Sequence, residues 1–233
     1  MNEVLRQEKK FLISLDQYYE LSHRLGQVMH EDVNNHGEGY NIRSLYFDTI
    51  YEKDYVDKED GVELRRKIRL RNYGPQTPFA MLEMKQKQGM MQKKRSLKMS
   101  REDAGHLISG DYGVLLKYSD PFAAECFGLM NTLCYVPKTV VEYKRKAFVA
   151  KENAIRVTFD HHMIGTESNY DIFSPELLQY SLLHPYMAVL EVKFNGFLLS
   201  YIKDILKNSG AGTGELAVSK YCLARGVSMH YRF

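Results

Sequence analysis

Charged residues recur at every second position in five segments of this sequence. The alternating positions are Arg6, Glu8 and Lys10; Lys67, Arg69 and Arg71; Glu83, Lys85 and Lys87; Arg156, Thr158 and Asp160; and Glu191 and Lys193. Side chains alternate between the two faces of a β-strand, so this spacing predicts five strands with one charged and one apolar face. For any single strand, the charged face can also be the solvated outer face of an antiparallel sheet.

Rows of cations on one strand face favour a bound anion. Arg and Lys side chains on the same face repel each other unless an anion lies between them. Arg offers a planar fork to phosphate oxygens, and Lys offers a compact charge. The carboxylates of Glu8, Glu83, Glu191 and Asp160 lie among the cations, and carboxylates are ligands that Mg²⁺ and Mn²⁺ prefer. The rows therefore predict binding of phosphate groups and a divalent metal, the main requirements of phosphoryl transfer.

A closed barrel would bring the charged faces together, because the inward side chains of all its strands share one lumen. We therefore predict an α+β fold: a closed antiparallel eight-stranded β-barrel with a polar lumen and helices packed outside. Apolar periodicity and capping residues predict helices over about residues 15–30, 101–109, 120–134, 175–183, 197–208 and 217–225. No linker-like segment separates the strands, so residues 1–233 are expected to form a single domain.

The composition is that of a globular protein with locally clustered charge. A hydrophobic fraction of 44% and a charged fraction of 26% exclude a disordered chain. The net charge is only +3, but Lys and Arg gather at residues 65–71, 85–98 and 144–151, which indicates one basic surface or cavity. The three cysteines lack a CxxC spacing, and the sequence shows neither a signal peptide nor a long apolar run. These features predict a cytoplasmic protein without a membrane span.

Nine short segments, taken in order, are similar to those of a known family. They are residues 6–11, 44–48, 67–71, 82–87, 93–95, 142–145, 155–160, 190–194 and 219–221. Through them the chain resembles, over nearly its whole length, the polyphosphate polymerase domain of the vacuolar transporter chaperone (VTC) complex. That domain is a branch of the CYTH-like triphosphate tunnel metalloenzymes. The resemblance implies a triphosphate tunnel inside the predicted barrel.

The resemblance also implies roles for individual residues. Those that would grip the triphosphate of ATP and the growing chain are Lys10, Arg69, Arg71, Lys85, Arg145, Arg156 and Lys220. Glu191 would be the principal metal ligand, with Glu8 and Glu83 as further candidates. The remaining candidate phosphate contacts are Arg6, Lys67, Lys87, Lys93, Arg95 and Lys193. Alternation puts Lys93 and Arg95 on one face of their strand and leaves open which face is inward.

Arg6 departs from the Glu-x-Glu-x-Lys strand with which many tunnel metalloenzymes begin. Hydrolases and cyclases of that group use the acidic pair for metal, so the departure favours the polymerase branch. The implied reaction is Mn²⁺- or Mg²⁺-dependent transfer of the ATP γ-phosphate to the end of a polyphosphate chain. The alternatives are a triphosphatase using the same site and a non-catalytic polyphosphate-binding module.

The expected partners are therefore ATP and inorganic polyphosphate or triphosphate. Nucleic acid is not expected, because Glu alternates with the cations. The complex that the chain resembles delivers its product across a membrane, and such delivery would require a membrane partner protein.

The sequence also gives expectations for a few polar residues outside the proposed roles. Asp48 and Asp160 could each pair with a cation of the site or close a turn at a strand end. His161 and His162 are adjacent, so in a strand they would point to opposite sides and share no metal. Glu142 would face away from Arg145 if both lie in one strand.

Overall fold

The computed structural model describes residues 6–89, 91–210 and 219–230, without the side chains of Arg6 and His230. The chain divides into two compact units. The first comprises Met1–Asn41, Tyr143–Ile164 and Leu183–Val218, and the second comprises Ile42–Glu142, Gly165–Leu182 and Ser219–Phe233. That residues 1–233 form a single domain stays a prediction. Within the described ranges, no helix has the length and apolar character needed to cross a membrane.

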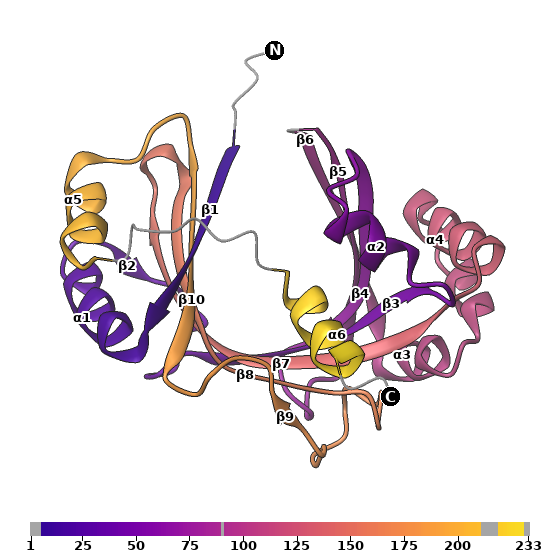
Figure 1. Cartoon of the computed structure of the whole chain (residues 1–233). Coiled ribbons are helices and arrows are strands. Elements are labelled where there is room, and N and C mark those ends of the chain that lie inside the picture. The colour runs from indigo at the N-terminus through magenta and orange to yellow at the C-terminus, as the bar shows by residue number, and fades with distance from the viewer. Residues whose placement is uncertain (1–5, 90, 211–218, 231–233) are drawn as a thin grey trace. The chain divides into compact units, whose positions relative to one another are not determined.

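Ten strands form one hydrogen-bonded sheet (Figure 1), in the order β1-β10-β8-β7-β3-β4-β5-β6, with β2 pairing with β7 and β9 with β8. The strands are β1 Arg6–Ser14, β2 His30–Glu31, β3 Tyr40–Thr49, β4 Leu64–Asn72, β5 Phe79–Gln88, β6 Met91–Ser100, β7 Tyr135–Ala150, β8 Ile155–Thr166, β9 Tyr180–Ser181 and β10 Met187–Asn195. The pairs β1–β10, β10–β8, β2–β7, β3–β4, β4–β5 and β5–β6 are antiparallel.

The prediction of a closed eight-stranded barrel is wrong. The path of paired strands begins at β1 and ends at β6, and over the described residues these two strands do not pair with each other. Alternation locates strands, but it does not specify which partner an end strand takes. The end strands carry Lys9 and Lys10 in β1 and Lys93, Lys94 and Lys98 in β6. Lysines on edge strands oppose the pairing of two sheet edges.

The helices confirm the α+β class. They are α1 Leu15–Gly26, α2 Lys53–Glu59, α3 Arg101–Ile108, α4 Pro121–Thr132, α5 Ser200–Asn208 and α6 Lys220–His230, with short 3-10 helices η1 Tyr112–Lys117 and η2 Glu152–Ala154. Ser100 caps α3 by accepting a hydrogen bond from the backbone N–H of Asp103 at 3.0 Å. Asp120 caps α4, which opens with Pro121. Local capping therefore predicted the starts of both helices correctly.

The predicted helix over residues 175–183 does not form. Residues 175–179 have no regular secondary structure, and β9 follows at Tyr180. The reason lies in side chains of distant strands. Arg43 of β3 and Asn72 of β4 donate hydrogen bonds to the Ile172 carbonyl at 3.1 and 2.7 Å, and Arg43 donates to the Ser174 carbonyl at 2.6 Å. These bonds hold the segment before Pro175 in an irregular conformation, and proline restricts the residue that precedes it.

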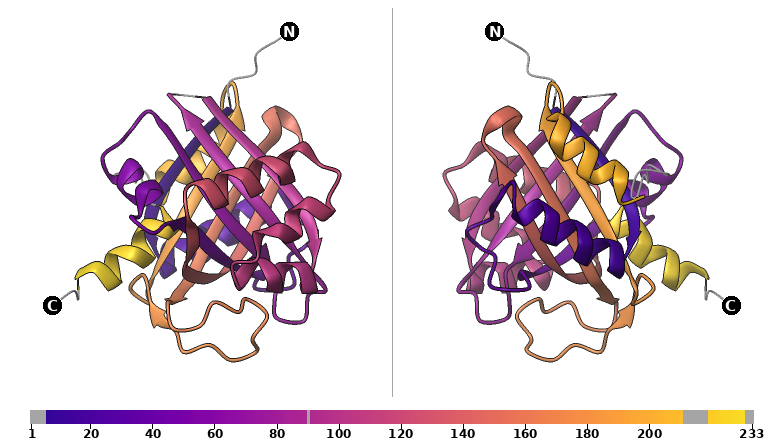
Figure 2. Two further views of the ribbon diagram at one scale, coloured as in Figure 1. Left: turned by 90° about the vertical axis from the view of Figure 1, so that its right-hand side faces the viewer. Right: turned by 90° about the vertical axis from the view of Figure 1, so that its left-hand side faces the viewer.

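The core of the first unit determines which face of its strands is charged. Helices α1 and α5 lie across one face of β1, β10 and β8 (Figure 2, right). Leu21 of α1 and Ile202 of α5 pack in one apolar cluster with Ile13, Phe159 and Leu190 of the strands. Because side chains alternate along a strand, the charged positions of these strands lie on the opposite face.

The second unit follows the same plan. Helices α3 and α4, with η1, cover one face of β4, β5 and β6 (Figure 2, left). Ile68, Leu70, Leu82 and Met84 alternate along β4 and β5 and join Cys126 of α4 in a second apolar cluster. The cations and the glutamate between these apolar residues therefore share the other face of the sheet.

Candidate functional site

The first unit aligns acidic and basic residues in register across three strands. Lys10 of β1 lies opposite Glu191 of β10, and Glu8 lies opposite Lys193. On its other side, β10 pairs with β8, where Glu191 lies opposite Thr158 and Lys193 lies opposite Arg156. We call Glu8, Lys10, Glu191 and Lys193 the Glu191 cluster.

Ion pairs link the Glu191 cluster. The Lys10 Nζ lies 2.8 Å from Oε1 of Glu8 and 3.8 Å from Oε2 of Glu191. Lys193 forms a second ion pair with Glu191. The side chain of Glu191 is 6% exposed, so these charges attract each other more strongly than they would in bulk water. The cluster therefore already holds a monovalent cation, the Lys10 ammonium, between two carboxylates.

Two predicted arginines of the first unit are also fixed by carboxylates. Asp160 receives hydrogen bonds from Nε and Nη2 of Arg145 at 2.6 and 2.7 Å. Burial alone would lower the pKa of Arg145, but Asp160 holds it well above the ordinary value. Arg156 lies 2.5 Å from an oxygen of Asp32 and 3.3 Å from the Tyr40 hydroxyl. Asp160 is thus the partner of a predicted site cation and does not close a turn.

The second unit gathers three cations on one buried carboxylate. Arg69 lies opposite Glu83 in the β4–β5 register, and its Nε lies 2.7 Å from Oε2. Arg71 Nε lies 3.8 Å from the same oxygen, and Lys94 Nζ lies 2.5 Å from Oε1. Burial alone would raise the pKa of Glu83, but the three cations lower it to about 2. We call these four residues the Glu83 cluster.

A row of lysines crosses three strands and shares Lys94 with the Glu83 cluster. Lys67 of β4 lies opposite Lys85 of β5, which lies opposite Lys94 of β6. Lys87 follows Lys85 on the same face of β5, half-buried. Like charges directly opposite each other destabilise an antiparallel sheet. This lysine row, defined as Lys67, Lys85 and Lys94, is therefore a place where a bound polyanion would stabilise the unit.

Helix α6 brings Lys220 into the second unit and is fixed by its neighbours. The hydroxyl of Tyr221 donates to Oδ2 of Asp48 at 2.7 Å, and the Tyr221 ring stacks on Tyr46 with centroids 5.3 Å apart. Lys67 donates a hydrogen bond to Ser219, just before α6. Lys220 opens the helix and is half-buried.

Asp48 has a structural role that the sequence left open. Its carboxylate accepts hydrogen bonds from the backbone N–H groups of Thr49, Asp54 and Tyr55 at 2.7, 2.9 and 2.9 Å. The bonds to Asp54 and Tyr55 satisfy donors in the first turn of α2. Together with the hydroxyl of Tyr221, they make Asp48 an anchor for both α2 and α6.

Lys93 and Arg95 do not lie with the Glu83 cluster. Arg95 lies opposite Met84, whose side chain belongs to the apolar core. Its guanidinium forms an ion pair with Glu125 of α4 and lies 5.1 Å from the ring of Phe122. Lys93, two residues earlier, is on the same face by alternation. The residue of this segment that reaches Glu83 is Lys94, which could be chosen only once the register of β6 was known.

The remaining predicted residues are placed as follows. The side chain of Arg6 lies outside the described residues, although its backbone begins β1. Glu142 lies in β7 with Arg145 and forms an ion pair with Arg43 at 2.5 Å. His161 and His162 do not point apart, because His162 has a positive φ of 49° and their rings contact each other at 4.8 Å. Sequence reasoning missed Asp32 and Tyr40, which hold Arg156 from a loop and from β3.

The described residues contain no group of three His, Cys, Asp or Glu side chains arranged to hold a metal ion. A divalent cation at Glu8 and Glu191 would therefore complete its coordination with oxygens from other sources. Mg²⁺ commonly binds one or two carboxylates together with substrate phosphates, so the donor set fits such an ion. Glu83 is a poorer candidate because three cations already surround it.

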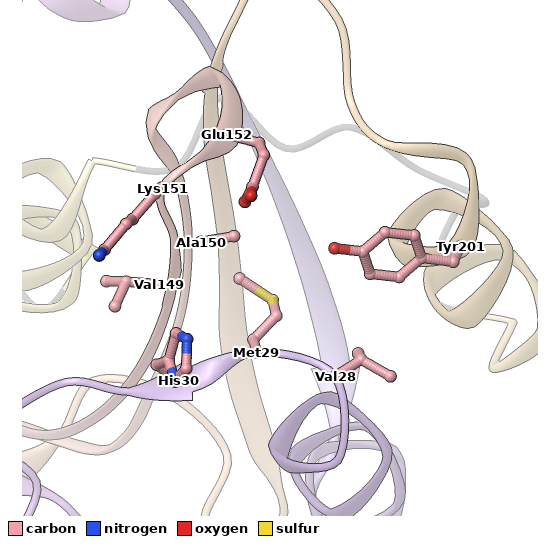
Figure 3. Close-up of a pocket in the computed structure, with 8 residues that line it drawn as sticks. All are labelled: Val28, Met29, His30, Val149, Ala150, Lys151, Glu152 and Tyr201. Atoms are coloured by element: carbon pink, nitrogen blue, oxygen red, sulfur yellow. The ribbon is translucent and has the colours of Figure 1, made fainter.

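A pocket of about 240 Å³ in the first unit contains none of the predicted site residues (Figure 3). In Figure 3, Lys151 and His30 lie on one side of this pocket and Tyr201 on the other. It is lined by Val28, Met29, His30, Val149, Ala150, Lys151, Glu152 and Tyr201. Its mixed lining does not match the charge pattern of the two clusters.

Several solved structures are similar to this chain. A protein of Bacillus halodurans, provisionally described as an adenylate cyclase, has a TM-score of 0.54 at 12% identity, with 94% of this chain and 96% of that chain covered. A protein of Pyrococcus horikoshii has a TM-score of 0.47 at 10% identity, with 96% and 99% covered. Another from that organism has a TM-score of 0.40 at 12% identity, with 89% and 92% covered. The first likeness shows a shared fold.

Comparison with the curated proteins finds no match. The sequence profile of the VTC domain, in contrast, matches residues 5–229. The match includes both units and every predicted site residue, and it confirms the resemblance on which their roles rest. This chain therefore belongs to the VTC domain family.

Proposed function

We propose that this protein is a metal-dependent polyphosphate polymerase that transfers the γ-phosphate of ATP to a growing polyphosphate chain. The observation that carries the proposal is the lysine row, in which Lys67, Lys85 and Lys94 lie side by side across three strands. A chain of phosphates supplies repeated negative charge, which would offset the repulsion within such a row. Membership of the VTC domain family supports the same substrate class.

Arginines of both units are suited to align phosphoryl groups. Glu83 fixes Arg69 and Arg71, and Asp160 fixes Arg145 through two hydrogen bonds. A guanidinium fixed by a carboxylate presents its other N–H groups in set directions. Phosphoryl transfer depends mainly on positioning and on charge neutralisation at the transferring group. Fixed cations provide both without needing to reorganise during the reaction.

The carboxylates divide into two roles in this proposal. Glu8 and Glu191 would hold Mn²⁺ or Mg²⁺, because they already share the ammonium of Lys10. The bound ion would supply charge neutralisation at phosphate oxygens. Glu83 would instead orient Arg69 and Arg71, since three cations already surround its carboxylate and lower its pKa. Lys10 would then move from the carboxylates to a phosphate group as the metal takes its place.

The products formed from ATP in the presence of Mn²⁺ test this proposal. Incubation followed by gel electrophoresis should show phosphate chains that lengthen with time. Release of orthophosphate without chains would replace the polymerase with a triphosphatase. Tight binding of triphosphate without turnover would leave a binding module, and failure to bind triphosphate would overturn the proposal entirely.

The lysine row is tested by two neighbouring variants of β6. Lys94→Ala should weaken triphosphate binding roughly tenfold, because a charge-assisted hydrogen bond is worth about 1.5 kcal/mol. Lys93→Ala is the matched control, since it removes the same charge from the opposite face of the strand, and it should stay within about twofold of the wild type. Calorimetric titration with triphosphate gives both affinities. Equal losses in the two variants would contradict the assigned face.

A further inference from the structure

Thr158 has a buried hydroxyl with no hydrogen-bond partner among the described residues. The residue lies in β8 and is 1% exposed, and its Oγ1 neither accepts nor donates a bond within the described part of the chain. It shares its strand face with Arg156 and Asp160 and lies directly opposite Glu191 of β10. Opposite residues in an antiparallel pair have Cβ atoms about 5 Å apart, so the side chains of Thr158 and Glu191 leave the sheet next to each other.

An unpartnered buried hydroxyl costs free energy, whereas valine has the same shape without that cost. The hydroxyl of Thr158 is therefore expected to gain a partner in another state of the protein. A contrast within the chain supports this reasoning. Thr139 is equally buried, in β7, and its hydroxyl donates to the Thr166 carbonyl at 3.2 Å.

Glu191 is the neighbour whose partners would change. In this structure its carboxylate forms ion pairs with Lys10 and Lys193. A phosphate chain would attract both ammonium groups, and a divalent cation would take one carboxylate oxygen. The other oxygen would then accept a new donor, and the Thr158 hydroxyl is the side chain opposite it in register. Ligating carboxylates are commonly held by such outer hydrogen bonds.

We propose that Thr158 is a positioning residue whose hydroxyl donates to the Glu191 carboxylate when phosphate and a divalent cation are bound. This inference rests on the proposed function, in which Glu191 is a metal ligand. It adds a residue to which the charge pattern gave no role, and it limits that role to the metal-bound state. Thr158 would act through Glu191 and would not touch the phosphate chain.

Three variants test the role of the hydroxyl. Thr158→Val removes it while keeping the shape of the side chain, and Thr158→Ser keeps it. Thr139→Val is the matched control, because it makes the same change at a buried strand position outside both clusters. Each folded protein is titrated with Mn²⁺ in the presence of tripolyphosphate, and free Mn²⁺ is counted by electron paramagnetic resonance. Each is also titrated with tripolyphosphate alone by calorimetry.

The expected result is a loss of Mn²⁺ affinity without a change in tripolyphosphate affinity. Thr158→Val should weaken Mn²⁺ binding about tenfold, the lower end of the usual effect of removing an outer hydrogen-bond partner. Thr158→Ser should restore wild-type affinity to within about threefold, and Thr139→Val should leave it unchanged. Binding of tripolyphosphate without metal should be the same in all four proteins.

Two outcomes would overturn the inference. The first is wild-type Mn²⁺ affinity in Thr158→Val. The second is an equal loss of tripolyphosphate binding without metal, which would mean that the hydroxyl contacts phosphate directly. Failure of the phosphate and metal site is distinguishable from both, because the wild-type protein itself would then bind neither tripolyphosphate nor Mn²⁺ with tripolyphosphate. Failure of the polymerase reaction alone is read from the products on the gel.

Discussion

At the scale of single residues, Glu83 shows how neighbouring charges overcome burial. Its side chain is 5% exposed, which by itself favours the neutral acid. Arg69, Arg71 and Lys94 reverse that preference and lower its pKa to about 2. The ionised carboxylate therefore stabilises the folded protein, because it is the shared partner of three cations.

The Glu83→Gln variant should show this linkage directly. The folded pKa lies below the ordinary value of 4.5, so the stabilisation is complete above that value and is lost as the pH falls toward 2. At pH 7 we expect the free energy of unfolding to fall by about 3 kcal/mol, because three cations lose their shared partner. The difference from wild type should shrink as the pH approaches 2, as measured by urea unfolding at several pH values.

Glu125→Gln is the control for this variant. Glu125 pairs with Arg95 on the opposite face of the sheet, but its side chain is 43% exposed. Exposed ion pairs contribute roughly 0 to 1 kcal/mol, so this variant should remain close to wild type at every pH. A comparable loss in both variants would show that the effect comes from removing any negative charge.

At the scale of elements, Asp48 connects a strand to two helices. Its carboxylate accepts from the backbone at the start of α2 and from the hydroxyl of Tyr221 in α6. Helix α6 carries Lys220 at its first position. The position of Lys220 therefore depends on the hydrogen bond that its neighbour Tyr221 donates to Asp48. Asp48 lies in β3, which is distant from α6 in the sequence.

Tyr221→Phe should loosen α6 without unfolding the second unit. The variant keeps the stacking on Tyr46 but loses the bond to Asp48, a hydrogen bond to a charged group worth about 1.5 to 3 kcal/mol. Amide hydrogen exchange within α6 should become faster, and that in β4 and β5 should change less. In the control Tyr112→Phe, the lost bond is to the Tyr135 carbonyl, so α6 should exchange at the wild-type rate. Unchanged exchange of α6 in Tyr221→Phe would disprove the anchoring role.

An element could be predicted from the sequence when its cause lies within the element itself, and not when that cause lies elsewhere in the chain. Alternation located β1, β4, β5, β8 and β10 because it is a property of each strand alone. The capping residues Ser100 and Asp120 located α3 and α4 for the same local reason. Helix α2 was missed because its first-turn donors bind Asp48, a residue of the preceding strand. Lys94 was missed because the choice between adjacent basic residues depends on strand register.

Closure of the sheet was predicted wrongly because it depends on the whole chain. Each charged strand face fits an open sheet and a closed barrel equally well. The outcome is determined by whether the first and last strands of the path pair, and the described parts of β1 and β6 do not. At the scale of the whole molecule, a pattern of charges therefore predicts which faces are polar, but not how the polar surface is enclosed.

Stability of the molecule as a whole combines buried carboxyls with opposite pH dependence. Burial and the nearby Asp48 raise the pKa of Asp54, Tyr135 and Arg66 act to lower it, and the net result is a pKa of about 7. Tyr135 donates to Asp54 at 2.8 Å, and Arg66 lies 3.9 Å away. This folded pKa lies above the ordinary value of 3.8. The folded state therefore binds the proton more tightly, and stability falls as the pH rises from about 4 to 7.

Asp54→Asn should remove this part of the pH dependence. The amide keeps an oxygen that can accept from Tyr135 but cannot ionise, so the variant should lose less stability than wild type between pH 4 and pH 7. Thermal unfolding across that range measures the difference, and Asp57→Asn controls for the loss of one negative charge from the same helix. Because the contribution of Glu83 is lost below about pH 4.5 and that of Asp54 is lost above about pH 4, the combined contribution of these two residues is greatest near pH 4 to 5. A wild-type pH profile in Asp54→Asn would show that Asp54 titrates normally in the folded protein.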